Sequence, residues 1–262
     1  MTGCYHKLQI FSASLFLFSF CNLAHAQTSQ VISEAKALLS DREAKAAIVQ
    51  LEPAWQADSQ NFKLCQLLVD AYGDRIDQVN MFKKRGLAKK MLRTMEQCYA
   101  LNPDEEFAQL NLVMFHTQAP SIVGGDKSAA KLLIDEISKT HPGRGLLMRA
   151  RLAVMEEDFE AASSFANAAI EANPENTEAL NVSGLIALQQ DRYSEAVALF
   201  KSCVAIDPEN YDCHYQIGKA SHLSGSNTDD GIAAFETFIG NGHDDPEYLA
   251  HAHYRLAELL IV

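Results

Sequence analysis

Prolines recur along this chain at similar intervals, and these intervals constrain its fold more than any other feature. They stand at positions 103, 142, 174, 208 and 246, so they are separated by 39, 32, 34 and 38 residues. Between Pro174 and Pro208, apolar residues recur every three or four positions on both sides of Gln190-Asp191, which is the period of an amphipathic helix. Each interval therefore predicts two helices joined by a turn, with a proline that closes the second helix.

Small residues mark the places where the two helices of a pair approach each other. Gly184, Ala196 and Pro208 follow one another at spacings of 12 and 12, and a small side chain lets helices pack closely. The unit resembles a tetratricopeptide repeat, which has 34 residues with small residues at its eighth and twentieth positions. Position 8 is Val113, Ala150, Gly184, Gly218 and Ala257; position 20 is Ala130, Ala162, Ala196 and Gly231; position 24 is Ile134, Ala166, Phe200 and Phe235.

The resemblance covers nearly all of residues 27–262 and implies an all-α fold. We predict one domain over 27–262, a right-handed superhelical solenoid of about five antiparallel helix pairs with a final unpaired helix. No strand-like alternation competes with this pattern, and stacked pairs share a core that no single pair could form. The chain departs from the family at position 4, where it has no tryptophan; Trp55, its only one, lies elsewhere.

The stretch "APSIVGGDKSAAK" at 119–131 raises the alternative of a phosphate-binding loop. Such a loop requires G-x-x-x-x-G-K-[ST] directly after a strand, whereas here Asp126 separates Gly125 from Lys127 and a helix precedes it. We therefore interpret the stretch as a lengthened connection between helices at about 105–118 and from about 128. Gly124 and Gly125 would supply positive φ and Asp126 would cap the second helix. A contact role for Ile122 and Val123 at the tip is the alternative.

In the tetratricopeptide family the first helix of each pair lines an inner groove, largely through positions such as 5 and 9. The resemblance implies a partner-binding groove of Leu110, Met114, Leu147, Arg151, Asn181, Leu185, Tyr215, Lys219, Tyr254 and Glu258, preceded less securely by Cys65 and Val69. No Lys-x-x-x-Asn pattern stands at these positions, which argues against a terminal-carboxylate clamp. The apolar N-terminal half favours an apolar helix or an extended peptide. The alternative is that Leu110, Met114 and Leu147 are packing residues.

The first 26 residues have the three parts of a secretory signal peptide. Lys7 precedes the apolar run from Leu8 to Phe20, and Ala24-His25-Ala26 forms an A-x-A cleavage site. We predict cleavage near Ala26 and a periplasmic or otherwise extracytoplasmic protein. A lipoprotein signal at Cys21 fits less well because Phe20 precedes it, and the apolar run is short for an uncleaved anchor.

The charge of the chain limits its partners. Removal of Lys7 would change the net charge from −12 to −13, and an acidic surface argues against nucleic acid or anionic membrane as the main partner. We expect no stable membrane insertion. Lys83-Lys84-Arg85 and Lys89-Lys90 form one basic patch, which we interpret as a solvated helix face.

Cysteines and histidines offer no metal site or catalytic site. Cys65, Cys98, Cys203 and Cys213 would remain after cleavage, either as buried thiols or in one of three disulfide pairings. Five histidines lie near the C-terminus without the convergence that zinc needs; they are His214, His222, His243, His251 and His253. No nucleophile, base or cofactor motif appears. We therefore predict no metal, no cofactor and no enzymatic activity.

The sequence thus predicts an exported, non-enzymatic scaffold that binds a protein or peptide partner of the cell envelope in its groove. The alternative is a small-molecule or peptide-binding accessory subunit of an envelope transport system, which a closed apolar cavity would favour. The last residues, "LAELLIV", lack a following helix. They could pack on the preceding repeat, which we favour, join another subunit, or mark a shortened chain, so the oligomeric state stays open.

Overall fold

The computed structural model describes residues 27–242 and 246–261, and within these ranges there is no strand. The predicted all-α helix-pair fold is confirmed. The predicted signal peptide, 1–26, and His243 lie outside the described residues. The chain divides into two compact units, residues 1–126 and 127–262, which are described separately.

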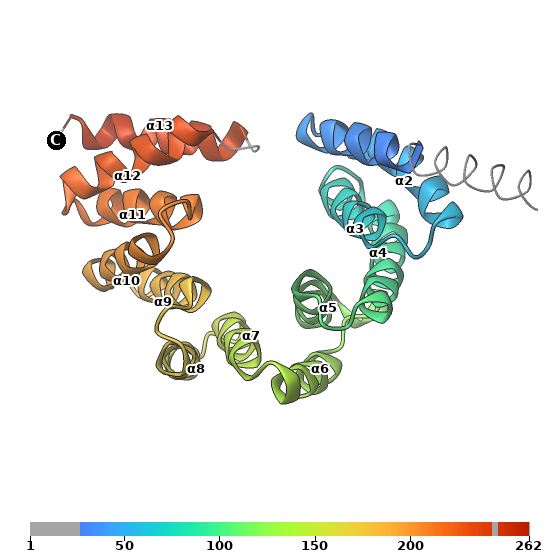
Figure 1. The fold of residues 1–262 in the computed structure, drawn as a ribbon, viewed down its shortest axis with the longest axis horizontal. Helices are drawn as coiled ribbons and strands as arrows, with labels where there is room; N and C mark the ends of the chain where they lie inside the picture. The colour runs from blue at the N-terminus through green and yellow to red at the C-terminus, as the bar shows by residue number, and fades with distance from the viewer. Residues whose placement is uncertain (1–26, 243–245, 262) are drawn as a thin grey trace, which may run out of the picture. The chain divides into compact units, whose positions relative to one another are not determined.

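The first unit contains helices up to the glycine-containing loop. Residues 27–40 are helical. They are followed by α2 (Ala44–Ala57), α3 (Phe62–Asp77), α4 (Met81–Leu101), α5 (Glu106–Gln118) and the short 3-10 helix η1 (Ser121–Val123). Each helix packs on the next along the chain from α2 to α5, as Figure 1 shows.

The second unit contains three helix pairs between single helices at its two ends. Its elements are α6 (Lys127–Thr140), α7 (Pro142–Met155), α8 (Phe159–Ala172), α9 (Thr177–Gln189), α10 (Tyr193–Ile206), α11 (Tyr211–Ser224), α12 (Thr228–Asn241) and α13 (Pro246–Leu259). We call α7, α9, α11 and α13 the A helices and α8, α10 and α12 the B helices. Direct contacts join α7 with α9, α9 with α11 and α11 with α13, so the A helices form a continuous layer (Figure 1).

The turns between A and B helices share one backbone feature. Glu157 and Asp191 both have φ near +60° in the turns after α7 and α9, and Asn227 has φ +55° before α12. This left-handed conformation lets the chain reverse within a few residues. Asparagine side chains then begin the next A helices, because Asn176 and Asn210 accept hydrogen bonds from the backbone N–H groups of Ala179 and Cys213, both at 3.1 Å.

The spacing of small residues predicted from the sequence has a direct structural cause. A Cβ added at Gly184 would lie 2.5 Å from the Phe200 ring, and one added at Gly218 would lie 2.6 Å from the Phe235 ring. Positions 8 and 24 of one repeat therefore meet face to face, and only a residue without a side chain fits opposite phenylalanine. Where position 24 is Ala166, position 8 is Ala150, and both are fully buried.

The core of the second unit passes without interruption from one pair to the next. Leu147, Ala166 and Ile186 belong to the cluster shared by α7, α8 and α9. Phe200 and Ile217 belong to the cluster shared by α9, α10 and α11. A third cluster joins α11, α12 and α13 through aromatic side chains and through the last buried residue, Leu259. Burial of this shared surface stabilises each pair only in the presence of its neighbours.

The four cysteines of the described residues form two disulfides, which settles a question that the sequence left open. Cys65 in α3 bonds Cys98 in α4, and Cys203 in α10 bonds Cys213 in α11. The first bond joins the two helices of one pair. The second joins a B helix to the following A helix.

The loop at 119–126 is a connection, as predicted, and its two glycines serve different purposes. Gly124 adopts φ +108°, whereas Gly125 has an ordinary φ, and a Cβ there would lie 1.7 Å from the Ala119 carbonyl oxygen. The expected positive φ at Gly125 is therefore wrong, and close backbone approach explains that glycine instead. Val123 is buried in η1, which packs on α4, so of the two tip residues only Ile122 is exposed.

Candidate functional site

The predicted groove residues lie on α5 and on the A helices, but they differ in accessibility. On α5 of the first unit, Leu110 and Met114 are half-buried. In the second unit Leu147 is only 2% exposed and belongs to the core, and Tyr215 is also buried. Those that retain accessible surface in the second unit are the half-buried Arg151, Asn181, Leu185, Lys219 and Glu258 and the exposed Tyr254.

The first polar contact along this layer joins α7 to α9. Arg151 Nη2 donates to Glu178 Oε1 at 2.9 Å, with about a third of each side chain exposed. One turn further along α9, the Asn181 side-chain oxygen is buried and accepts no hydrogen bond within the described residues. A buried amide oxygen without a donor is energetically unfavourable.

The second polar group spans α11 and α13. Arg255 Nη1 donates to the Tyr215 hydroxyl at 2.6 Å, and its guanidinium carbon lies 5.9 Å from the centre of that ring. Burial lowers the pKa of Lys219, and the nearby positive charge of Arg255 lowers it further. Within the described residues, neither cation forms an ion pair with a carboxylate. Two adjacent cations that form no ion pair favour the binding of an anionic ligand.

A carboxylate lies beside these cations, on the next turn of α13. Glu258 accepts a hydrogen bond from the Tyr254 hydroxyl at 2.5 Å and lies 2.5 Å from His222 Nε2. The Tyr254 bond and then the His222 bond lower the pKa of Glu258. His222 is on α11, so this contact ties α13 to α11 across the A-helix layer. The residues chosen at positions 5 and 9 include Lys219, Tyr254 and Glu258. They do not include Arg255, at position 6, or His222, at position 12.

A separate pocket lies on the other side of α7. Its volume is about 360 Å³, and its walls come from α6, α7 and α8: Lys131, Ile134, Asp135, Arg149, Leu152, Ala153, Glu156, Asp158, Ala161 and Phe165. Two residues span about 200° of helix, so Arg149 and Arg151 point in opposite directions. No feature of the groove register could have indicated this pocket.

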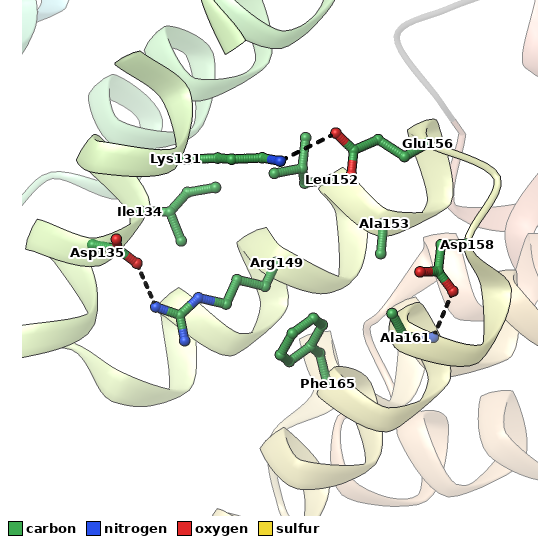
Figure 2. A pocket seen from close by; sticks show the side chains of 10 residues that line it. All are labelled: Lys131, Ile134, Asp135, Arg149, Leu152, Ala153, Glu156, Asp158, Ala161 and Phe165. Carbon is green, nitrogen blue, oxygen red and sulfur yellow. Dashed lines mark hydrogen bonds and ion pairs between the residues drawn. The ribbon is translucent and has the colours of Figure 1, made fainter. Parts of the chain in front are cut away.

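The pocket has an apolar floor and a charged rim whose ions are already paired. Arg149 Nη2 lies 2.6 Å from Asp135 Oδ1, and Lys131 Nζ lies 3.6 Å from Glu156 Oε1. Figure 2 shows both ion pairs, with Phe165 pointing toward Arg149 from α8. The cavity is open to solvent rather than closed. These properties do not match the closed apolar cavity that a small-molecule carrier would require.

The described residues do not assemble a metal centre or a membrane span. Among residues 27–242 and 246–261, no three histidine, cysteine or acidic side chains come together as metal ligands. Over the same ranges, no helix combines the length and the apolar character needed to cross a bilayer.

Comparisons with known proteins address the fold. The tetratricopeptide-repeat family model matches residues 147–211, which run from α7 to the start of α11. No curated protein sequence matches the chain. The structure of a tetratricopeptide repeat protein from Parabacteroides merdae is similar with a TM-score of 0.51 at 14% identity, covering 90% of this chain and 99% of that one.

Two further solved structures are also similar. A monomeric mutant of IFIT1, solved with m7Gppp-AAAA, has a TM-score of 0.50 at 15% identity, and the match covers 90% of this chain and 57% of that one. This chain therefore spans little more than half the length of IFIT1. YrrB, described as a TPR protein with an unusual peptide-binding site, has a TM-score of 0.43 at 16% identity, with coverage of 78% and 97%.

At these identities the structural likeness concerns the fold alone, and a fold of this kind is typically non-catalytic and suited to protein–protein interaction in general. The match of the family model covers α7 to α10 and includes the contact between Gly184 and Phe200. Residues 147–211 carry tetratricopeptide repeats.

Proposed function

We propose that this protein is an exported, non-enzymatic scaffold that binds an extended peptide segment of a partner protein along the A-helix layer of the second unit. The observation that carries the proposal is a row of half-buried polar groups on consecutive A helices: Arg151, Asn181, Lys219 and Arg255. These groups present both a hydrogen-bond acceptor and cations toward the same layer.

The chemistry of the row specifies the kind of segment. The half-buried Asn181 has an amide group, which can hydrogen-bond to the backbone of an extended peptide. Lys219 and Arg255 form no ion pair within the described residues, so they favour an acidic side chain. On the same A-helix layer, the half-buried Leu185 and the exposed Tyr254 provide apolar contact. The partner is therefore an extended segment with at least one carboxylate.

Two features support export and a scaffold role. Disulfides persist in oxidising compartments outside the cytosol, and two are present here. The signal-like first 26 residues agree with that compartment.

The alternative of a small-molecule-binding transport accessory draws on the 360 Å³ pocket, but the open shape and the paired rim charges favour the scaffold.

Selection from a displayed peptide library tests the binding proposal. The full chain should enrich acidic extended peptides, and the double substitution Lys219→Glu and Arg255→Glu should weaken their binding at least about tenfold, because each charged contact is worth about 1.5–3 kcal/mol. The matched control is Lys127→Glu with Lys139→Glu, which makes the same charge change at exposed positions on α6. Equal enrichment of acidic peptides by the double variant and by the control variant would contradict the proposal. So would failure of the parent chain to enrich such peptides.

A further inference from the structure

The first half of α4 carries a concentration of positive charge that the acidic chain shows nowhere else in its sequence. Between Asp77 and Glu96 there is no acidic residue, yet this interval contains six cations: Lys83, Lys84, Arg85, Lys89, Lys90 and Arg93. Two of them have carboxylate partners, since Lys90 lies 2.6 Å from Glu52 and Lys84 lies 4.0 Å from Asp77. The other four form no ion pair within the described residues.

Three of the four cations without ion pairs share one face of the helix with an aromatic side chain. Phe82, Arg85, Lys89 and Arg93 follow one another at spacings of three, four and four residues, which places them on one side of α4. We call these four residues the α4 stripe. All four are exposed, and at 1.5 Å per residue the stripe extends roughly 16 Å.

Two apolar side chains at the start of α4 are exposed to an extent that packing does not explain. Phe82 is 94% exposed and Met81 is 80% exposed. Both directly precede Lys83 in sequence, so they lie within the positive region rather than apart from it. Exposure of a large apolar side chain beside a cluster of cations indicates a surface that another phase or molecule covers.

We propose that the α4 stripe, together with Met81, docks this protein peripherally on a membrane surface that contains anionic phospholipid. In such a surface, phosphate groups lie just outside the acyl chains, so cations and an apolar wedge find their partners within about 5–10 Å of each other. An acidic protein would satisfy the cations but would not by itself require two exposed apolar side chains at one end. The lipid surface accounts for both features.

The net charge of −12 does not prevent this docking. At physiological ionic strength the Debye length is about 8 Å, so a membrane in contact with α4 responds mainly to the charges on that face. The sequence interpretation of the basic residues as a solvated helix face took no account of Phe82 and Met81. This inference does not depend on the peptide-binding proposal, which concerns the second unit.

Vesicle sedimentation of the processed, exported chain tests the inference. The probes are vesicles of phosphatidylcholine alone and vesicles in which phosphatidylglycerol replaces about one third of the lipid. We expect binding to the second kind only, and loss of binding near 1 M salt, where the Debye length is about 3 Å. The substitutions Arg85→Gln, Lys89→Gln and Arg93→Gln together should lower the partition coefficient about 100-fold, at about fivefold for each cation.

Two further variants separate the contributions. Phe82→Ala should weaken vesicle binding about tenfold through loss of the apolar contact, while its circular dichroism stays that of the parent because the side chain is exposed. The control combines Lys36→Gln, Lys127→Gln and Lys139→Gln, which remove the same charge from other exposed positions and should leave vesicle binding unchanged.

Three results would overturn the inference. They are failure of the parent protein to bind the anionic vesicles, equal binding by the α4 variants and the control, and capture by immobilised polyglutamate without vesicle binding. The last result would assign the surface to an acidic protein instead. Circular dichroism detects unfolding of a variant independently of vesicle binding. If the triple substitution unfolds the protein, the vesicle binding of Phe82→Ala tests the inference instead.

Discussion

Gly184 of α9 lies against the ring of Phe200 of α10, and a Cβ at the glycine would come within 2.5 Å of that ring. Phe200 is fully buried, so its ring has no space into which it could move. The same relationship recurs one repeat later between Gly218 and Phe235. This contact determines how closely the A and B helices of a pair approach each other.

Substitution of Gly184 tests the contact. Gly184→Val should lower the free energy of unfolding by about 2–3 kcal/mol, because a buried helix pair must separate to admit the side chain. The control is Gly240→Ala on α12, where an added Cβ meets no atom within 4 Å and a change within about 0.5 kcal/mol is expected. Urea unfolding measures both. Equal stabilities of the two variants would show that the pair tolerates a wider separation.

The two disulfides should contribute unequally to stability. They close chain separations of 33 and 10 residues, and the chain-entropy model gives about 3 kcal/mol for the shorter loop and about 1 kcal/mol more for the longer one. We expect Cys65→Ala with Cys98→Ala to destabilise more than Cys203→Ala with Cys213→Ala. Denaturant unfolding measures the difference. Modification of Cys65, Cys98, Cys203 or Cys213 by a thiol reagent in the unreduced, unfolded chain would contradict the pairing altogether.

Acid should loosen α13 before the other helices. The Glu258 carboxylate binds protons more weakly in the folded state, mainly because Tyr254 and then His222 donate to it. Its contacts therefore stabilise the fold above the ordinary carboxyl pKa, and this contribution is lost as the pH falls through the lowered value. Melting temperatures of the parent and Glu258→Gln should differ above about pH 5 and converge in stronger acid. A gap independent of pH would contradict this account.

Export is tested at the N-terminus. When the full chain is expressed in a bacterial host, mass spectrometry of the protein from the envelope fraction should identify Gln27 as its first residue. Ala26→Arg should block this cleavage, because the signal peptidase requires a small residue there. An unprocessed chain recovered only from the cytosol would refute the export proposal, and the disulfides would then need another explanation.

Much of the second unit could be predicted from the sequence because its repeats are constrained by pairs of residues. The register that aligned Gly184, Ala196 and Pro208 identified the helices and the turn at Asp191. It assigned Phe200 to position 24 without predicting its contact with Gly184. The length of the 119–126 connection was also predicted. The contacts made by this connection could not be predicted, because Val123 is buried against α4, which lies more than 20 residues earlier in the chain.

The site was less predictable. The position of a residue in the repeat gives the helix face on which it lies, but it does not tell whether the side chain is accessible to a partner. Leu147 stands at a groove position, yet its side chain is in the core, since the neighbouring small residues Ala150, Ala166 and Ala179 leave space that a larger side chain fills. Arg255 occupies position 6 and so fell outside the chosen positions, although it contacts Tyr215. The disulfide partners likewise depend on distances between helices that spacing alone does not give.

The most direct measurement of the central proposal is site-specific photo-crosslinking in the cell. A photoreactive residue at Leu185, half-buried on A helix α9, is compared with one at Ala198, exposed on B helix α10. We predict that Leu185 crosslinks to a partner polypeptide, that Lys219→Glu with Arg255→Glu abolishes this product, and that Ala198 gives none. Crosslinks from Ala198 but not from Leu185 would contradict peptide binding along the A-helix layer.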